Sequence, residues 1–250
     1  MRERVRHFFL TIGDFAGFAF RSTWKGIREP IKYSEFIEQA YFIGWQSLPV
    51  VLFAGFFAGL SQTLFLENEL DAYGAKMTIG RVLGITAIRE LGPLVVSLMF
   101  IGRVGAAFAA EIGSMKVASQ VEAIEALGQD PERKLASPRI WGMTLVALPV
   151  VLLTDLFVLL GGWVISTVSS DMFWYQARMA VYFRHTTSSY VKPFVFGWMI
   201  STVATWYGLR TEGGVRGVGR SVSSTVVTCC IWLFIVNALV GIVMIAWTGI

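Results

Sequence analysis

Long apolar stretches separated by short polar segments dominate the pattern of the chain. Residues 39–66 and 221–250 contain no charged residue, and residues 140–168 are interrupted only by Asp155. A fourth apolar stretch follows at about residues 190–209. Because a helix needs roughly 20 apolar residues to cross a bilayer, each stretch predicts a transmembrane helix.

Residues 79–110 predict a further span although they carry Arg89, Glu90 and Arg103. Omitting this segment leaves four spans whose basic loops no longer alternate across the membrane. Including it predicts five spans and places the two termini on opposite sides. The predicted spans are about residues 45–66, 79–110, 140–168, 190–209 and 224–248, in one transmembrane domain over 33–250 that follows an N-terminal segment, 1–32.

The composition also indicates an all-α integral membrane protein. Of 250 residues, 55 % are hydrophobic and only 15 % charged, whereas soluble domains are about a quarter charged. This excludes a soluble nucleic-acid binder, a disordered chain and a disulfide scaffold. The two cysteines, Cys229 and Cys230, are adjacent in an apolar stretch, and we expect them to be packing residues.

Basic residues are distributed unevenly between the predicted loops. The N-terminal segment, the second loop and the fourth loop together hold fifteen Lys and Arg residues, and the other two loops hold five. Since cytoplasmic loops are enriched in Lys and Arg, we expect a cytoplasmic N-terminus and an external C-terminus. Most of the net charge of +4 is therefore a signal of topology.

The N-terminal segment predicts an interfacial amphipathic helix rather than a signal peptide. At about 100° per residue, His7, Asp14 and Arg21 lie opposite an apolar face, with Leu10 and Phe18 as exceptions. The apolar face comprises Val5, Phe8, Phe9, Ile12, Phe15, Ala16, Ala19 and Phe20. We expect this helix to rest on the inner leaflet as an anchor; the alternative is a role in handling substrate.

Arg89 and Glu90 stand just before Pro93 in the second predicted span. Proline lacks an N–H and its ring clashes with the carbonyl of Arg89, so we expect a kink there. Charges in hydrocarbon persist where they face a polar cavity or another subunit. Adjacent helical side chains diverge too far to pair with each other. We therefore expect a polar seam at a transport path or dimer interface, the alternative being a structural pair that orients the kink.

The loop between the second and third spans predicts a short amphipathic helix over residues 116–127. Its apolar positions recur at i, i+4 and i+7, and two acidic residues lie off that face. The apolar positions are Val117, Val121 and Ile124, and the acidic residues are Glu122 and Glu125. Such a helix either rests at the membrane interface or docks a soluble partner, and periodicity alone leaves both open.

Three other segments have unusual composition. Asp155 is a lone acid in the third span, for which a hydrogen-bonded structural role is favoured over a proton or cation site. Residues 170–186 predict an aromatic-rich outer helix, and the glycine-rich residues 213–220 a tight cytoplasmic turn. The chain has no phosphate-loop motif and no metal-spaced His/Cys set, so we do not expect catalysis or a bound cofactor or metal.

Residues 78–142 contain an ordered series of motifs: Arg-Glu-Leu-Gly-Pro at 89–93, Gly-Arg-Val-Gly at 102–105, Glu-Ile-Gly-Ser-Met at 111–115, the run at 120–128, Asp-Pro at 130–131 and Ser-Pro-Arg at 137–139. This series closely resembles the MlaE-type permeases, the membrane subunits of lipid-transporting ABC systems that work with MCE proteins. The resemblance implies a dimer, most simply a homodimer, in which each copy docks one cytoplasmic ATPase that holds ATP and Mg. It also implies an outward-facing lipid pocket beneath a hexameric MCE ring.

The resemblance assigns roles to two sets of residues. It implies that residues 116–127, with Val117, Val121, Glu122, Ile124, Glu125 and Leu127, form the coupling helix that docks the ATPase. It also implies that Arg89 and Glu90 lie near the lipid pocket. We further infer, from position alone, that Gln62, Phe65, Leu70 and Tyr73 line that pocket.

Together these features predict a non-catalytic permease subunit in the bacterial inner membrane. It would move phospholipid or a related lipid between that membrane and a periplasmic MCE protein, with ATP hydrolysed on a separate chain. Two alternatives are an ion-coupled secondary transporter that uses Asp155 or Glu90, and a membrane scaffold for an ATPase and MCE assembly that transports nothing itself.

Overall fold

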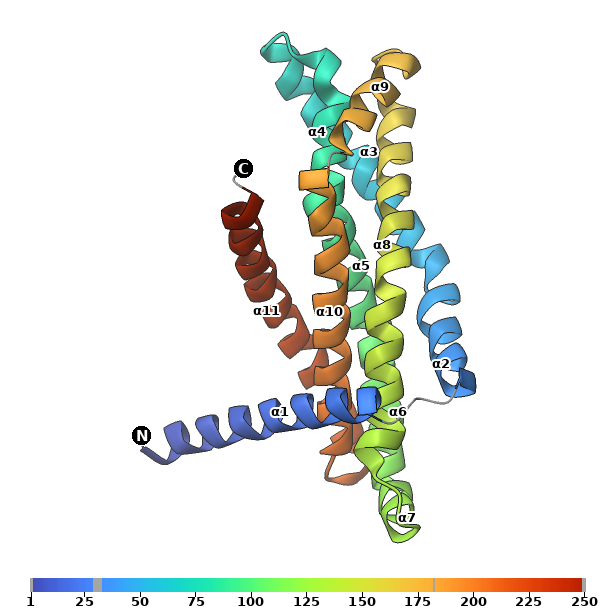
Figure 1. Ribbon diagram of the computed structural model, residues 1–250, viewed down its shortest axis with the longest axis vertical. Helices are drawn as coiled ribbons and strands as arrows, with labels where there is room; N and C mark the ends of the chain where they lie inside the picture. Colours follow the sequence, from blue (N-terminus) through green and yellow to red (C-terminus); the bar gives the residue numbers. More distant parts are fainter. Residues whose placement is uncertain (1, 29–32, 182, 249–250) are drawn as a thin grey trace. The chain divides into compact units, whose positions relative to one another are not determined.

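The computed structural model describes the backbone of residues 2–28, 33–181 and 183–248, and side chains over 10–28, 33–181 and 190–246 (Figure 1). Within these ranges the regular structure is entirely helical, which confirms the all-α class. The main helices are α1 (Arg2–Arg28), α2 (Tyr33–Ala40), α3 (Leu48–Ala72), α4 (Ile79–Thr86), α5 (Gly92–Phe100), α6 (Ala106–Val117), α7 (Gln120–Ala126), α8 (Ser137–Ile165), α9 (Ser170–Ala180), α10 (Phe183–Leu209) and α11 (Gly214–Thr248).

Short helical turns of other types connect several of these helices. A 3-10 turn, η2, covers Lys76–Thr78. Four π-helical turns are η1 (Tyr41–Trp45), η3 (Ala87–Leu91), η4 (Ile101–Gly105) and η5 (Glu132–Ala136). A π-helical turn holds an extra residue and is frequent at functional sites.

Four helical stretches of the described chain are long and apolar enough to cross a membrane. They are Tyr33–Ala72, Lys76–Val117, Glu132–Ile165 and Gly214–Ala246; they contain the first and second predicted spans and most of the third and fifth. The charged segment 79–110 therefore does lie in a long apolar helix. The predicted fourth span lies within α10.

The chain divides into two compact units. The first unit comprises Met1–Tyr41, Ile101–Met143 and Trp198–Cys230, and the second comprises Phe42–Phe100, Thr144–Gly197 and Ile231–Ile250. The candidate lipid-path residues Arg89 and Glu90 lie in the second unit, and the predicted coupling helix lies in the first.

Glycines bring α3 and α8 into close contact within the second unit. A Cβ at Gly59 would lie 2.0 Å from the carbonyl oxygen of Val158, and one at Gly161 would lie 2.0 Å from that of Phe56. Small residues four apart, such as Gly55 and Gly59, allow helix backbones in membranes to approach closely. This close approach fixes the position of α8 beside α3.

The substitution Gly59→Ala is expected to destabilise the protein by about 2 kcal/mol, because the backbone of Val158 must move away. The matched control is Gly13→Ala in α1, where an added Cβ meets no atom within 4 Å. Alanine favours a helix by about 1 kcal/mol over glycine, so the control should raise stability. Thermal unfolding in lipid nanodiscs checks both, and a rise in the midpoint of Gly59→Ala would refute the close packing.

In the first unit, α1 lies across the ends of α8 and α10 (Figure 1). Phe18 is fully buried in a cluster with Ala136, Ile140 and Trp206. Phe18, an exception to the predicted apolar face, packs on the protein. Face members such as Ile12 and Phe20 are exposed, so they remain free for the predicted contact with the leaflet.

The structure also corrects two predicted segments. The glycine-rich residues 213–220 are not a turn, because α11 begins at Gly214, and the turn covers only the preceding residues. The single helix predicted over residues 116–127 is two pieces: α6 ends at Val117, and Ser119, at a φ of 55°, separates it from α7. The outer helix predicted over 170–186 is present as α9, and it ends at Ala180.

Candidate functional site

The charged pair of the second span lies on a π-helical turn immediately before Pro93. In this turn, η3, the backbone N–H of Gly92 donates to the carbonyl oxygen of Ala87, five residues earlier. Pro93 has no N–H to offer the carbonyl of Arg89, four residues earlier. Instead, the ammonium group of Lys192 on α10 donates to that carbonyl oxygen at 2.7 Å. A lysine side chain thus supplies the donor that the proline lacks.

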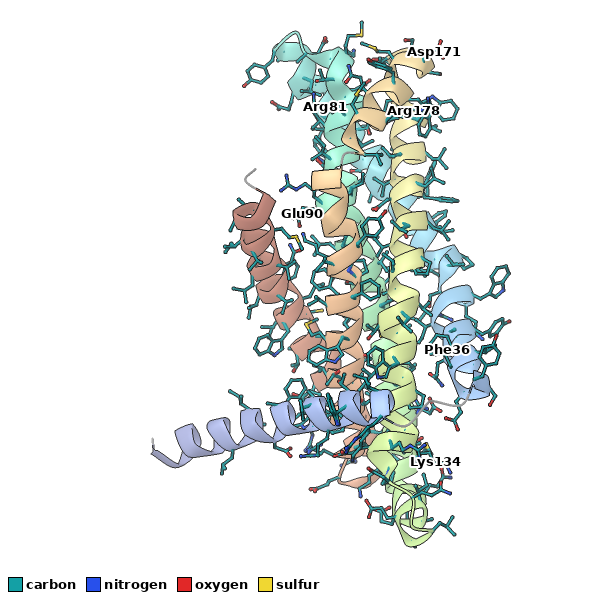
Figure 2. The ribbon with its side chains drawn as sticks, viewed as in Figure 1. Phe36, Arg81, Glu90, Lys134, Asp171 and Arg178 are labelled. Carbon is teal, nitrogen blue, oxygen red and sulfur yellow. The ribbon has the colours of Figure 1, made fainter. Side chains whose placement is uncertain are left out.

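The same ammonium group joins Glu90 in a polar cluster. Lys192 Nζ lies 2.7 Å from Glu90 Oε1, and the amide Nδ2 of Asn237 on α11 donates to Glu90 Oε2 at 2.9 Å. Figure 2 labels Glu90, which lies between α10 and the C-terminal part of α11. The Lys192 side chain is 1 % exposed and that of Glu90 is 45 % exposed. The cluster therefore combines a buried cation with a carboxylate whose side chain is partly exposed.

A cavity of about 340 Å³ opens beside this cluster. We call it the Glu90 cavity; it is lined by Ile85, Thr86, Arg89, Glu90, Lys192, Gly241, Met244 and Ile245. One end is polar and the wall contributed by α11 is apolar. Among the described side chains, no carboxylate forms an ion pair with the guanidinium of Arg89. The cavity therefore offers an unpaired cation next to an apolar surface.

Four other residues predicted to line the lipid path lie outside the Glu90 cavity. Phe65 and Tyr73 are exposed, and Gln62 is half-buried. Leu70 packs against the core cluster formed by α4, α8 and α9. The structure thus brings together Arg89 and Glu90 but not these four, whose pocket role stays a prediction.

Asp155 is buried in the second unit and does not line the Glu90 cavity. A Cβ at Gly92 would lie only 1.7 Å from Asp155 Oδ1, so the carboxylate packs directly against the start of α5. This position fits the structural role favoured from the sequence.

In the predicted coupling segment, the apolar residues divide into an inner and an outer set. Val121 is buried with Ile112 and Leu135, and Ile124 packs on the same cluster. Leu127 is 76 % exposed, and Val117, at the end of α6, is partly exposed. Val121 and Ile124 therefore hold α7 on the protein. Leu127 is the apolar residue best placed to meet a partner.

Both acidic residues of this segment, Glu122 and Glu125, are exposed. The ammonium group of Lys116 lies 2.5 Å from Glu122 Oε1, and its hydrogen bond lowers the pKa of that carboxyl group. The pair connects the last turn of α6 to α7 across the break at Ser119.

Ion pairs connect α1 to the segment that follows α7. Arg21 Nη2 lies 3.0 Å from Glu132 Oε1, and Lys25 pairs with both Asp130 and Glu132. The hydrogen bond to Glu132 raises the pKa of Arg21. Burial alone would lower the pKa of Lys25, but its two carboxylate partners raise it. Sequence reasoning assigned these basic residues to topology and did not identify this network.

Lys192 and Asn237 are the site residues that the sequence interpretation missed. Lys192 was counted as a loop charge, although it precedes Pro193 at the start of an apolar stretch. Asn237 is the only amide or charged side chain in residues 221–250. A lone amide in a long apolar stretch is a usable signal, because polar groups within membranes seek partners.

Comparisons with known proteins agree over most of the chain. A family profile described as Permease MlaE matches residues 36–243. A probable ABC transporter permease protein of Rickettsia felis is 35 % identical over 243 residues, which cover 95 % of this chain and 93 % of the relative. The intermembrane phospholipid transport system permease protein MlaE of Haemophilus influenzae is 30 % identical, over 76 % of this chain and 75 % of its own. The Arabidopsis thaliana chloroplast protein TRIGALACTOSYLDIACYLGLYCEROL 1 is 32 % identical, over 84 % and 61 % respectively.

Proposed function

The chain belongs to the MlaE permease family and is a permease subunit of an ABC transporter, and on that premise we propose that it moves phospholipid between the inner membrane and a periplasmic MCE protein. Energy comes from ATP hydrolysed on a separate ATPase subunit, which holds ATP and Mg. The permease itself supplies the lipid path and the surface that docks the ATPase.

The observation that carries this proposal is the Glu90 cavity. It places the guanidinium of Arg89, which has no carboxylate partner among the described side chains, beside an apolar wall that includes Met244 and Ile245. A guanidinium group binds phosphate oxygens through two parallel N–H bonds, while an apolar wall suits acyl chains. An ion site would not need the apolar wall. The Haemophilus influenzae relative is named for intermembrane phospholipid transport, and its name supports the same substrate class.

The proposed assembly follows from the same premise. Two copies form a dimer, each with five spans, a cytoplasmic N-terminus and a periplasmic C-terminus, and an MCE ring lies on the periplasmic side. The excess of Lys and Arg in alternate segments supports this orientation. The exposed residue Leu127 and a neighbouring cavity of about 470 Å³, lined by α1, α7 and the end of α10, support ATPase docking at this surface.

Gentle purification followed by mass spectrometry tests the proposal. We expect an ABC ATPase, an MCE-domain protein and phospholipid to co-elute with the tagged chain. Phospholipid should fall with the Arg89→Gln variant while the protein partners remain. Co-elution of the proteins with no phospholipid above that of an unrelated membrane protein would favour a scaffold and contradict the transport proposal.

A further inference from the structure

We propose that the Glu90 cavity selects a headgroup with one net negative charge, a phosphodiester whose remaining part is polar but carries no cation. This inference rests on the proposed lipid transport and adds its headgroup preference. Phosphatidylglycerol has this chemistry, whereas phosphatidylethanolamine and phosphatidylcholine carry an additional cation.

The charges around the cavity favour a ligand with one net negative charge. Arg89 and Lys192 are cations, and Glu90 is the only carboxylate among the described lining residues. Lys192 and Glu90 compensate each other at 2.7 Å, so the described lining has one net positive charge, on Arg89. Bringing one phosphodiester anion to Arg89 makes the site neutral. A charge left uncompensated in an apolar surrounding is costly.

Lys192 already balances the charge of Glu90. Its ammonium group lies 2.7 Å from Glu90 Oε1, and Asn237 donates to Oε2. A zwitterionic headgroup would bring its phosphate to Arg89 together with an ammonium group for which no uncompensated carboxylate is left among the described lining residues. The occupied site would then keep one net positive charge beside an apolar wall, which is costly. The cluster therefore disfavours zwitterionic headgroups although it contains a carboxylate.

Asn237 contributes to the same preference by holding Glu90. A carboxylate only accepts hydrogen bonds, so the Asn237 amide must turn its Nδ2 toward Glu90. Its Oδ1 is then left buried with no hydrogen-bond partner among the described residues. A buried unsatisfied acceptor costs free energy, and the hydrogen bond from Nδ2 to Glu90 offsets part of that cost while it orients the carboxylate. With the carboxylate so held, Arg89 is the one uncompensated charge among the described lining residues.

The size and walls of the cavity suit a headgroup rather than a whole lipid. Its volume of about 340 Å³ lies near the lower end of the range for small-molecule sites. Gly241 leaves open space, because a Cβ added there would meet no atom within 4 Å. Ile245 lines the cavity and is also half-exposed. Acyl chains can therefore leave the cavity along the outer apolar surface of α11.

Lipid competition on the purified full-length protein tests the headgroup preference. Phosphatidylglycerol, phosphatidylethanolamine and phosphatidylcholine with identical acyl chains would compete for a fluorescent phospholipid. We expect phosphatidylglycerol to bind at least about tenfold more tightly, which is about 1.4 kcal/mol. The Arg89→Gln variant should reduce this preference below about threefold. Equal or tighter binding of phosphatidylethanolamine to the unmodified protein would overturn the proposal.

Two further experiments test whether the lipid binds in this cavity and whether the site binds lipid rather than soluble phosphate. Gly241→Leu fills the cavity without replacing a residue of the ion cluster and should weaken phosphatidylglycerol binding at least about tenfold. Gly219→Leu, at another open position of α11, is the matched control and should leave binding unchanged. Equal effects of the two variants would overturn the assignment to this cavity. So would displacement of lipid by inorganic phosphate or glycerol 3-phosphate at millimolar concentration, because the site would then bind soluble phosphate.

The outcomes also separate this inference from the proposed function. Tight phospholipid binding with no headgroup preference would refute the selectivity and leave phospholipid transport standing. Loss of specific binding for every phospholipid would refute both.

Discussion

Replacement of Lys192 by methionine is expected to lower ATP-dependent lipid transfer about a hundredfold and to destabilise the protein by about 3 kcal/mol. Lys192 serves two acceptors at once, Glu90 Oε1 and the carbonyl oxygen of Arg89. Removing one partner of a buried ion pair costs about 3–5 kcal/mol, and the partial exposure of Glu90 favours the lower end. Transfer between liposomes and thermal unfolding in nanodiscs measure the two effects. Lys134→Met, at an exposed lysine, is the control and should change neither.

A double-mutant cycle with Pro93 tests why Lys192 matters. In the Pro93→Ala background, residue 93 regains an N–H that can reach the carbonyl of Arg89. Lys192→Met should then be less destabilising, by about 1 kcal/mol, the value of one hydrogen bond. Strict additivity of the two substitutions would show that the lysine does not replace the missing proline donor.

The substitution Leu127→Asp is expected to abolish co-purification of the ATPase while the chain still inserts into the membrane. Leu127 is 76 % exposed at the end of α7, so an aspartate there leaves the core intact. Placing a charge in a desolvated apolar contact typically costs at least about 2 kcal/mol, enough to lose a complex of moderate affinity. Pull-down with a tagged permease measures the loss.

The control for Leu127→Asp is Met77→Asp, an equally drastic change at an exposed residue on the proposed periplasmic side. It should retain the ATPase. We also expect Ile124→Asp to abolish co-purification, but Ile124 packs on the cluster of Val121, so that variant disturbs α7 as well as its surface. Unchanged pull-down of Leu127→Asp would contradict docking at α7.

The fold could be predicted largely because its signals are local. The length and continuity of apolar stretches placed the long helices, including the charged segment 79–110. The packing of Phe18 on the protein was not predicted, and the start of α11 was misplaced, because both depend on tertiary contacts and backbone conformation. Periodicity does not show which apolar face of α1 packs on Trp206 and Ile140, and the glycines at 213–220 did not prevent a helix.

The candidate site could be predicted only in part, for a similar reason. Arg89 and Glu90 were visible because charges stand out in an apolar stretch beside a proline. Their partners lie 102 and 147 residues from Glu90 in the sequence, at Lys192 and Asn237. No local pattern connects such distant residues. The pairing of Glu90 with Lys192, which leaves Arg89 without a carboxylate partner among the described side chains, therefore emerged only from the packed helices.

Lipid transfer by the reconstituted complex tests the central claim most directly. The permease would be placed in liposomes with its ATPase and MCE partner, with fluorescent phospholipid in the bilayer and transfer to or from acceptor protein followed over time. We predict transfer that requires ATP hydrolysis and falls at least tenfold with Arg89→Gln at unchanged complex assembly. Transfer driven by a pH gradient without the ATPase, or an assembled complex that hydrolyses ATP and moves no phospholipid, would contradict the account.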